Sequence, residues 1–283
     1  MYFWPFQPLI MKNIAFLVFY AAMAAISCND NPPPTGNEIP PSPPAIPYTV
    51  INSYPHDTAF FTEGLEIHDG QLFESSGSGA ASEDDPGYYP SAFGITDLKT
   101  GKVTIKGTLD KAKYFGEGIT FFKGKMYQLT WKNGVGFVYD ATSYKKIREF
   151  KIPAKEGWSL THDSTHLIMS DGTSNLYFLD PDSLGVVKNL PVSDNNGPVP
   201  NINELEYVNG FIYANQWLTP YILKIDANSG KVVGRLDLSN LEKDVKAKDP
   251  DVHEMNGVAW NSTTNTLYIT GKLWPSIFEL RLQ

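Results

Sequence analysis

The stretch Tyr114-Phe115-Gly116-Glu117-Gly118-Ile119-Thr120 places one carboxylate between two glycines at the start of an apolar strand. An apolar strand begins just after Gly118, so we expect the Glu117 side chain to lie where the chain enters a core rather than on a solvated face. Related phrases recur along the chain, which is typical of folds built from repeated units. The recurrence indicates both a fold and a site at its centre.

Five openings of this kind are present. They read Thr62-Glu63-Gly64-Leu65, Gly116-Glu117-Gly118-Ile119, Glu156-Gly157-Trp158-Ser159, Ile202-Asn203-Glu204-Leu205 and Met255-Asn256-Gly257-Val258. Aligned on Glu63, Glu117, Gly157, Asn203 and Asn256, they lie 54, 40, 46 and 53 residues apart. Each is followed by a turn and a short apolar strand, as in Asp69-Gly70-Gln71-Leu72-Phe73, and then by a third strand that ends in an acid or near one. These are hairpin signals in units that need neighbours to bury their faces.

A fourth strand follows in four of the five repeats, and the fifth repeat lacks one before Gln283. The segment Tyr48-Thr49-Val50-Ile51-Asn52-Ser53 precedes the first repeat and has the length and pattern to fill that place. We therefore predict an all-β fold, a five-bladed β-propeller over residues 48–283 whose last blade is closed by an N-terminal strand. Two segments do not fit the repeat. We expect a loop over one face at residues 76–90, and a short helix or a solvated loop at residues 241–253.

The composition supports this reading and excludes one class of partner. The chain has 283 residues, of which 42% are hydrophobic and 13% aromatic, which is ample for the core of one large domain. Its formal net charge is -8, so it offers no basic surface for nucleic acid. We expect a monomer.

The N-terminal part reads as an export signal and a tether. Residues 13–27 are uncharged and too short to cross a bilayer comfortably, and they end at Cys28, the only cysteine. Ala25 and Ser27 before a lone cysteine resemble the lipobox of bacterial lipoproteins; the alternative is a buried or free thiol. Residues 29–47 are rich in proline and favour an extended tether. We therefore expect an exported lipoprotein of the bacterial cell envelope, periplasmic or surface-exposed, held to the membrane through lipid at Cys28 only.

The repeat openings should converge on the central channel, because the innermost strands of a propeller surround it. Carboxylates and amides gathered there can coordinate a cation, tune each other's pKa or satisfy backbone groups. A second set of positions lies seven residues after the turn glycines, at Trp131 and Trp217, and the fifth repeat carries Lys272 in that slot. Trp158 joins them from the third repeat.

Two interpretations of these side chains remain open on the residues alone. In the first, Trp131, Trp158 and Trp217 are walls of a pocket in which Glu117 carries a proton and Lys272 and Asn203 donate hydrogen bonds. In the second, the tryptophans pack in the core or between blades.

The order and the residues of seven short motifs resemble a known family, the glutaminyl-peptide cyclotransferases of the plant and bacterial type. The motifs are residues 54–65 (Tyr-Pro-His-Asp-Thr-Ala-Phe-Phe-Thr-Glu-Gly-Leu), Phe115-Gly116-Glu117-Gly118, Glu156-Gly157-Trp158, Asn203-Glu204-Leu205-Glu206, Asn215-Gln216-Trp217, Asn256-Gly257-Val258-Ala259 and residues 270–275 (Thr-Gly-Lys-Leu-Trp-Pro). The resemblance extends from about residue 48 to the end of the chain, and the family's five-bladed propeller agrees with the repeat count.

The resemblance implies an acyltransferase that converts an N-terminal glutamine of peptides or proteins into pyroglutamate and releases ammonia. It assigns acid–base catalysis to Glu117 and stabilisation of the reacting oxygen to Lys272. It assigns substrate binding to Phe61, Glu63, Trp131, Trp158, Asn203 and Trp217. If Glu63 lies beside Glu117, the two acids should raise one pKa and share a proton. The scheme requires no metal and no other cofactor.

Two rival functions have different chemistry. Glu63, Asn203 and Asn256 suit a cation in a metal-dependent propeller lactonase or hydrolase. A non-catalytic, lipid-anchored binding propeller is the other rival.

Overall fold

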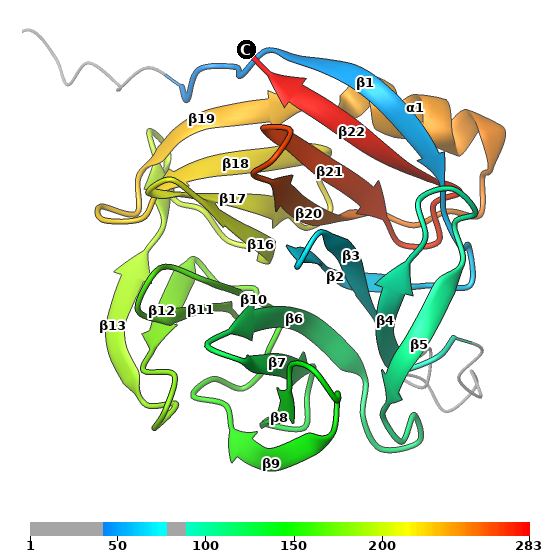
Figure 1. Ribbon diagram of the computed structural model, residues 1–283. Coiled ribbons are helices and arrows are strands. Elements are labelled where there is room, and N and C mark those ends of the chain that lie inside the picture. The colour runs from blue at the N-terminus through cyan, green and yellow to red at the C-terminus, as the bar shows by residue number, and fades with distance from the viewer. Residues whose placement is uncertain (1–41, 78–88) are drawn as a thin grey trace, which may run out of the picture. The chain divides into compact units, whose positions relative to one another are not determined.

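Five antiparallel sheets of four strands surround a central axis (Figure 1). The computed structural model describes residues 42–77 and 89–283, which belong to a unit spanning residues 39–283. The predicted signal segment with Cys28, and the tether up to residue 41, lie outside the described residues. In the described part of the chain, no helix has the length and apolar character needed to cross a membrane.

The blades follow one another in chain order. From the axis outward they comprise β2 (Thr62–His68), β3 (Gln71–Ser76), β4 (Ala92–Thr96) and β5 (Val103–Thr108); β6 (Gly116–Phe122), β7 (Lys125–Thr130), β8 (Val135–Asp140) and β9 (Lys146–Lys151); β10 (Ser159–His162), β11 (Leu167–Ser170), β12 (Asn175–Leu179) and β13 (Val186–Pro191); β16 (Ile202–Val208), β17 (Phe211–Gln216), β18 (Tyr221–Asp226) and β19 (Val232–Asp237); and β20 (Met255–Asn261), β21 (Thr266–Gly271), β22 (Ser276–Leu282) and β1 (Tyr48–Pro55). A two-stranded ribbon, β14 (Ser193–Asp194) with β15 (Gly197–Pro198), lies between the third and fourth blades in sequence.

The N-terminal strand closes the ring as predicted. β1 pairs antiparallel with β22, from Tyr48 opposite Leu282 to Pro55 opposite Ser276. Each innermost strand contacts the innermost strand of the next blade, and β20 contacts β2. The predicted five-bladed propeller is confirmed. Its last blade is completed by β1, the strand that precedes the first blade in the chain.

Tight turns set the register of the inner hairpins. Asp69 and Gly70 both have positive φ, of 49° and 73°, and the pairs Lys123-Gly124 and Asn209-Gly210 repeat this conformation. Two successive positive φ angles define the hairpin turn whose twist matches that of the flanking strands, and glycine adopts them without strain. The turn residues seen in the sequence therefore fix which strand residues face the axis.

The hairpin register corrects one position of the repeat alignment. The equivalent apolar residues of the inner strands, each opposite a residue of the second strand, are Leu65, Ile119, Leu160, Leu205 and Val258. The residues two positions earlier are Glu63, Glu117, Trp158, Asn203 and Asn256. Trp158, and not Gly157, is therefore the counterpart of Glu117 in the third blade. The pair Glu156-Gly157 looks like Glu117-Gly118, and only strand pairing resolves the shift of one residue.

The core consists of five apolar clusters, one between each pair of neighbouring blades. Phe73 of blade 1 packs with Ile119 and Phe121 of blade 2, for example. Burying such side chains contributes about 25 cal/mol per Å² of apolar surface. Because each blade covers its neighbour, the ring is stabilised as a whole rather than blade by blade.

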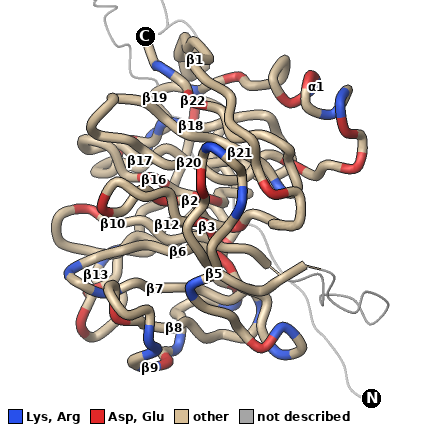
Figure 2. The backbone as a smooth tube through the Cα atoms, turned by 45° about the vertical axis from the view of Figure 1, so that its right-hand side comes forward, with Lys and Arg blue, Asp and Glu red and all other residues tan. Residues whose placement is uncertain are grey.

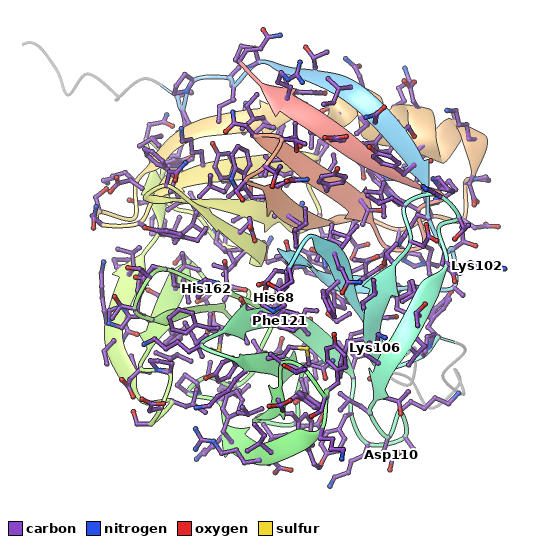
Figure 3. The ribbon with its side chains drawn as sticks, in the orientation of Figure 1. His68, Lys102, Lys106, Asp110, Phe121 and His162 are labelled. Atoms are coloured by element: carbon purple, nitrogen blue, oxygen red, sulfur yellow. The ribbon has the colours of Figure 1, made fainter. Side chains whose placement is uncertain are left out.

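Buried carboxylates join the innermost strands where no sheet pairing exists. Glu204 accepts the backbone N–H of Leu65 at 3.2 Å and that of Val258 at 2.7 Å. Glu66 accepts the N–H of Phe121 at 3.0 Å, beside a stack of His68 on Phe121 (Figure 3). These side chains satisfy backbone donors that face the channel, which would otherwise be buried without a partner.

Glu66→Gln should flatten the pH dependence of stability. Burial raises the pKa of Glu66 to about 8, with the Phe121 N–H opposing the shift. A carboxyl whose folded-state pKa is raised stabilises the fold fully below its unfolded pKa, and this contribution is lost as pH rises through the folded pKa. Between about pH 5 and about pH 8, the free energy of unfolding of the wild type should therefore fall by a few kcal/mol relative to Glu66→Gln, as measured by urea unfolding.

Glu279→Gln is the matched control, because Glu279 also lies between strands but its pKa is lowered. Burial acts to raise that pKa, and hydrogen bonds from Asn52, Tyr54 and Thr266 outweigh it. Its effect should be constant over this pH range. Parallel pH profiles for the wild type and Glu66→Gln would contradict the assignment.

Two segments lie outside the repeat. Residues 239–248 form the only α-helix among the described residues, α1 (Ser239–Lys248), whose sequence carries charged residues of both signs (Figure 2). After α1 the chain passes through His253 and Glu254 into β20. The other segment, residues 76–90, lies partly outside the described residues, and its described end includes Tyr89.

At the start of the domain, Ala45 bridges Arg235 of β19, so the last residues of the predicted tether run along blade 4.

Candidate active site

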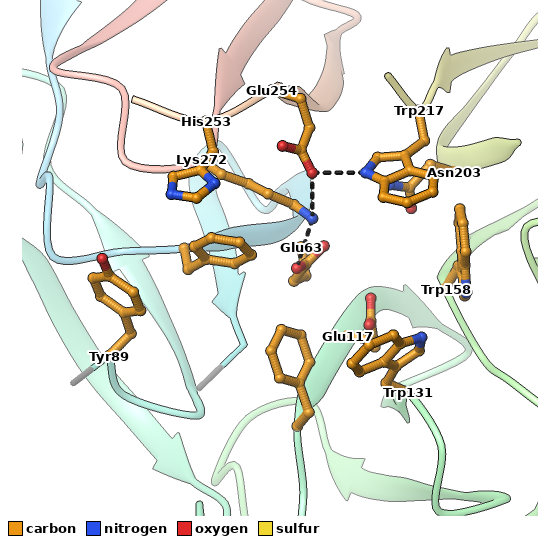
Figure 4. A pocket seen from close by; sticks show the side chains of 12 residues that line it. Glu63, Tyr89, Glu117, Trp131, Trp158, Asn203, Trp217, His253, Glu254 and Lys272 are labelled. Atoms are coloured by element: carbon orange, nitrogen blue, oxygen red, sulfur yellow. Dashed lines mark hydrogen bonds and ion pairs between the residues drawn. The ribbon is translucent and has the colours of Figure 1, made fainter. Parts of the chain in front are cut away.

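A cavity of about 370 Å³ lies where the innermost strands begin (Figure 4). Its lining residues are Phe61, Glu63, Tyr89, Phe115, Glu117, Trp131, Trp158, Asn203, Trp217, His253, Glu254 and Lys272. All eight residues predicted as catalytic or substrate-binding are in this set. All five blades contribute, through the innermost strands, the residues just before them and the residues just after the second strands, so the closed ring is required to assemble the cavity.

Glu117 is held by its backbone, while its carboxyl group points into the cavity (Figure 4). Its carbonyl accepts a hydrogen bond from Ser75 Oγ at 2.8 Å, and the next N–H, of Gly118, donates to Trp158 O at 3.0 Å. A Cβ on Gly118 would lie 2.5 Å from Ser159 Cα, so glycine is needed for blades 2 and 3 to approach. The Gly-Glu-Gly pattern thus serves the packing of three blades around one side chain.

Lys272 lies between two carboxylates. Its Nζ is 2.9 Å from Glu63 Oε1 and 3.3 Å from Glu254 Oε1, and it also lies 4.7 Å from the centre of the Phe61 ring. Burial acts to lower the pKa of Lys272, but Glu63, Glu254 and Glu117 outweigh it and raise that pKa. Lys272 is therefore a fixed cation in the cavity, and two ion pairs leave one of its three N–H donors for a substrate.

The two central carboxyl groups differ in their partners. Glu63 accepts a hydrogen bond from Asn256 Nδ2 at 3.0 Å in addition to the Lys272 contact. Glu117 is 5% exposed, and its carboxyl group has no hydrogen-bond or ion-pair partner among the described residues. Burial and the nearby Glu63 raise the pKa of Glu117 well above its usual range, with Lys272 opposing. Burial also raises the pKa of Glu63, to about 7, although Lys272 lowers it. Lys272 and Asn256 stabilise the charged form of Glu63, so Glu117, which lacks such partners, is the carboxyl group of the pair that favours the protonated form.

Glu63→Gln should move the ionisation of Glu117 to lower pH. Removing the negative charge of Glu63 removes a repulsion and leaves the Lys272 cation to act on Glu117. In a pH profile of kcat/KM, one limb follows the α-amine of the substrate and the other reports Glu117. The second limb, recognised because it does not change with substrates of different amine pKa, should shift toward acid. An unchanged or alkaline-shifted limb would show that the two carboxyl groups are not coupled in this way.

Carboxylates also orient the three tryptophan walls. The indole N–H groups of Trp131 and Trp158 both donate to Glu156 Oε2, at 2.8 and 2.9 Å, and that of Trp217 donates to Glu254 Oε1 at 2.7 Å. The rings of Trp158 and Trp217 meet edge to face at 5.5 Å. The polar edge of each indole is thus satisfied, which leaves its apolar face to the cavity.

The repeat also explains the slot that holds Lys272. The backbone N–H groups of Trp131, Trp217 and Lys272 donate to equivalent carbonyls, those of Phe115, Asn201 and Glu254. In the third blade this slot is Gly172, and a Cβ there would lie 2.4 Å from the ring of Trp158. The ring of Trp158 therefore occupies, in the third blade, the space that Trp131, Trp217 and Lys272 occupy in the other blades.

Four lining residues were not predicted, namely Tyr89, Phe115, His253 and Glu254, and neither was Glu156, which orients two of the tryptophans. Glu156, Glu254 and Phe115 lie two residues before the axis-facing position of their blades, as does the predicted Phe61. Side chains two apart on a strand share a face, so the corrected alignment contains this signal. Asn203 was predicted to donate hydrogen bonds and lines the cavity, and its Oδ1 is buried without a partner among the described residues.

A proton-carrying glutamate beside a fixed cation, in a mainly apolar cavity, suits acid–base chemistry on a small polar group. The fold and this pocket together define an enzyme of the propeller class. Among the described residues, no three His, Cys, Asp or Glu side chains are grouped to hold a metal ion.

Comparison with known proteins gives the family. The family model of glutamine cyclotransferase matches residues 18–282. Glutaminyl-peptide cyclotransferase of Arabidopsis thaliana is 37% identical over 237 residues, which cover 83% of this chain and 71% of the plant protein. The crystal structure of Myxococcus xanthus glutaminyl cyclase matches with a TM-score of 0.74 and 33% identity, over 85% of this chain and 98% of the bacterial one. The chain belongs to the glutamine cyclotransferase family, which confirms the predicted family and enzyme class.

Proposed function

We propose that this chain cyclises N-terminal glutamine of peptides to pyroglutamate with release of ammonia, using Glu117 as the proton carrier. The observation that carries the proposal is the unpaired, buried carboxyl group of Glu117 beside the Glu63–Lys272 ion pair. Family membership supports the reaction over a metal-dependent lactonase or a binding propeller.

The cavity meets the needs of the reaction in order. The α-nitrogen attacks the side-chain carboxamide carbon, so a C–N bond forms and negative charge develops on the carbonyl oxygen. Lys272 Nζ is the cation placed to stabilise that oxygen. Glu117 then gives its proton to the departing nitrogen and takes one from the attacking nitrogen, so the C–NH₂ bond breaks and ammonia leaves. The tryptophan walls hold the side chain folded for intramolecular attack, and Asn203 supplies a polar contact from the cavity lining.

An assay on the full chain tests the reaction. A Gln-initiated peptide should lose its free amine and release one ammonia per molecule, with turnover unaffected by a chelator. The same peptide with an acetylated α-amine is the matched control and should release none, because no nucleophile remains. Absence of turnover would contradict the proposal. Turnover that is abolished by EDTA would favour a metal-dependent mechanism.

We also propose that the protein is exported and anchored through lipid at Cys28, and that it acts as a monomer. The uncharged segment before Cys28 and the proline-rich segment after it support the first point. For the second, β1 pairs with β22 of the same chain, so the ring closes without a second copy. The mass of membrane-purified protein should show removal of residues 1–27 and a lipid adduct that Cys28→Ala lacks. Light scattering of the detergent-free Cys28→Ala protein should give the mass of one chain.

A further inference from the structure

His56 is a buried residue that the proposed chemistry does not use. It lies between β1, which closes the ring, and β2, which carries Glu63. Its Nδ1 is 2.6 Å from Trp274 O, and its Nε2 is 2.9 Å from Glu74 Oε1. A carbonyl only accepts hydrogen bonds, so Nδ1 carries a proton, and the Nε2–Glu74 contact shares a second one. The ring thus connects two blades by polar contacts in a buried place.

One end of this contact leads to Glu63. Glu74 accepts a hydrogen bond from Thr62 Oγ1 at 2.7 Å through Oε1, and one from Thr96 Oγ1 at 3.0 Å through Oε2. Thr62 directly precedes Glu63 in β2. The orientation of Glu74 therefore fixes the backbone from which Glu63 projects into the cavity.

The other end leads to Lys272. The turn after β21 comprises residues 272–275. The carbonyl oxygen of Trp274 in this turn accepts a hydrogen bond from Nδ1 of His56. The backbone N–H of His56 also donates to Pro275 O at 3.0 Å, and Leu273 N donates to Phe60 O at 3.1 Å. The turn that carries the lysine is thus held against the residues between β1 and β2.

We propose that His56 and Glu74 form a positioning pair that sets the placement of Lys272 relative to Glu63 and Glu117. Neither residue lines the cavity, so both act through Thr62 and the turn at residues 272–275. The proposal rests on the proposed function, because it explains how the cation of that site is held. The residue that directly follows the closing strand β1 thereby helps to position the site.

Two substitutions break the pair at different ends. His56→Asn keeps a donor near Trp274 O but does not reach Glu74, whereas His56→Gln reaches toward Glu74 and loses the Trp274 contact. Each should lower kcat by about 10- to 100-fold with little change in KM, because a displacement of about 1 Å in an active site is enough for such a loss. Tyr54→Phe is the matched control: it removes a hydrogen bond of 2.7 Å to Glu279 in the same closing strand, with no link to the lysine turn.

A second measurement separates positioning from loss of stability. Lys272 lowers the pKa of Glu117, so its displacement should move the ionisation of Glu117 to higher pH. The infrared carboxyl band that disappears in Glu117→Gln follows this ionisation without turnover. An alkaline shift in the His56 variants and none in Tyr54→Phe is the expected result.

Several outcomes would overturn the proposal. The pair is only structural if the His56 variants lower the melting temperature as Tyr54→Phe does but leave kcat and the Glu117 ionisation unchanged. If neither His56 variant folds, Thr62→Val removes one hydrogen bond to Glu74 at nearly constant size, and an unshifted Glu117 ionisation in it rejects the pair. A wild-type chain that releases no ammonia would instead reject the proposed function, whereas the infrared result would still decide the positioning.

Discussion

The turnover rate of Glu117→Gln should be about 10²- to 10⁴-fold lower than that of the wild type, the range that one general acid–base group contributes. The amide cannot accept a proton from the attacking nitrogen or give one to the departing nitrogen. The fold should be retained, because the carboxyl group of Glu117 has no hydrogen-bond or ion-pair partner among the described residues. Ammonia release at saturating peptide and a thermal melt measure the two parts of this prediction.

Glu66→Gln provides the control for this result. It makes the same chemical change in the same propeller, on β2, at the other end of a strand from the cavity. Its turnover should stay within about twofold of the wild type, because Glu66 does not line the cavity and independent sites act nearly additively. Near-normal turnover of Glu117→Gln would mean that another group carries the proton.

Lys272→Met should lower kcat by about 10²- to 10³-fold, the loss seen when one donor to a developing oxyanion is removed. Methionine keeps much of the side-chain length and apolar contact but removes the charge. KM should change less than kcat, because the interaction strengthens only as negative charge forms on the carbonyl oxygen. Steady-state kinetics with one Gln-initiated peptide distinguishes the two effects.

Lys125→Met is the corresponding control. Lys125 pairs with Asp182 at 3.5 Å on the surface, and exposed pairs of this kind contribute little. Its kinetics should match those of the wild type. A higher KM with unchanged kcat in Lys272→Met would assign Lys272 to substrate binding alone.

The fold followed from local signals that recur. Pairs such as Asp69-Gly70 specify hairpin turns wherever they occur, and five copies of the same hairpin pattern leave few alternatives to a ring of five blades. The strand at residues 48–55 was predicted because one repeat lacked its fourth strand. The one-residue error at Trp158 arose because local likeness to another opening does not report strand pairing.

The site was predictable where the repeat places a residue and harder to predict where contacts decide its role. Lys272 stands out in the sequence because two other repeats have tryptophan in its slot. Glu156 and Glu254 carry no such signal until the blades are in register, since their importance lies in the indole N–H groups that they accept. His56 is part of a motif that resembles the family. Its partners Glu74 and Trp274 are 18 and 218 residues away in the sequence, so local sequence does not reveal the contacts.

The sequence by itself therefore determined the propeller, its five blades, its closing strand and the eight predicted residues that line the cavity. These features depend on periodicity, turn chemistry and family resemblance, all of which are present in the order of residues. Only the tertiary structure decided which carboxyl group holds the proton, how the cation is placed and which residues hold both. Those properties depend on distances and burial among side chains from different blades, because the interaction between charges depends on their separation and on the exclusion of water.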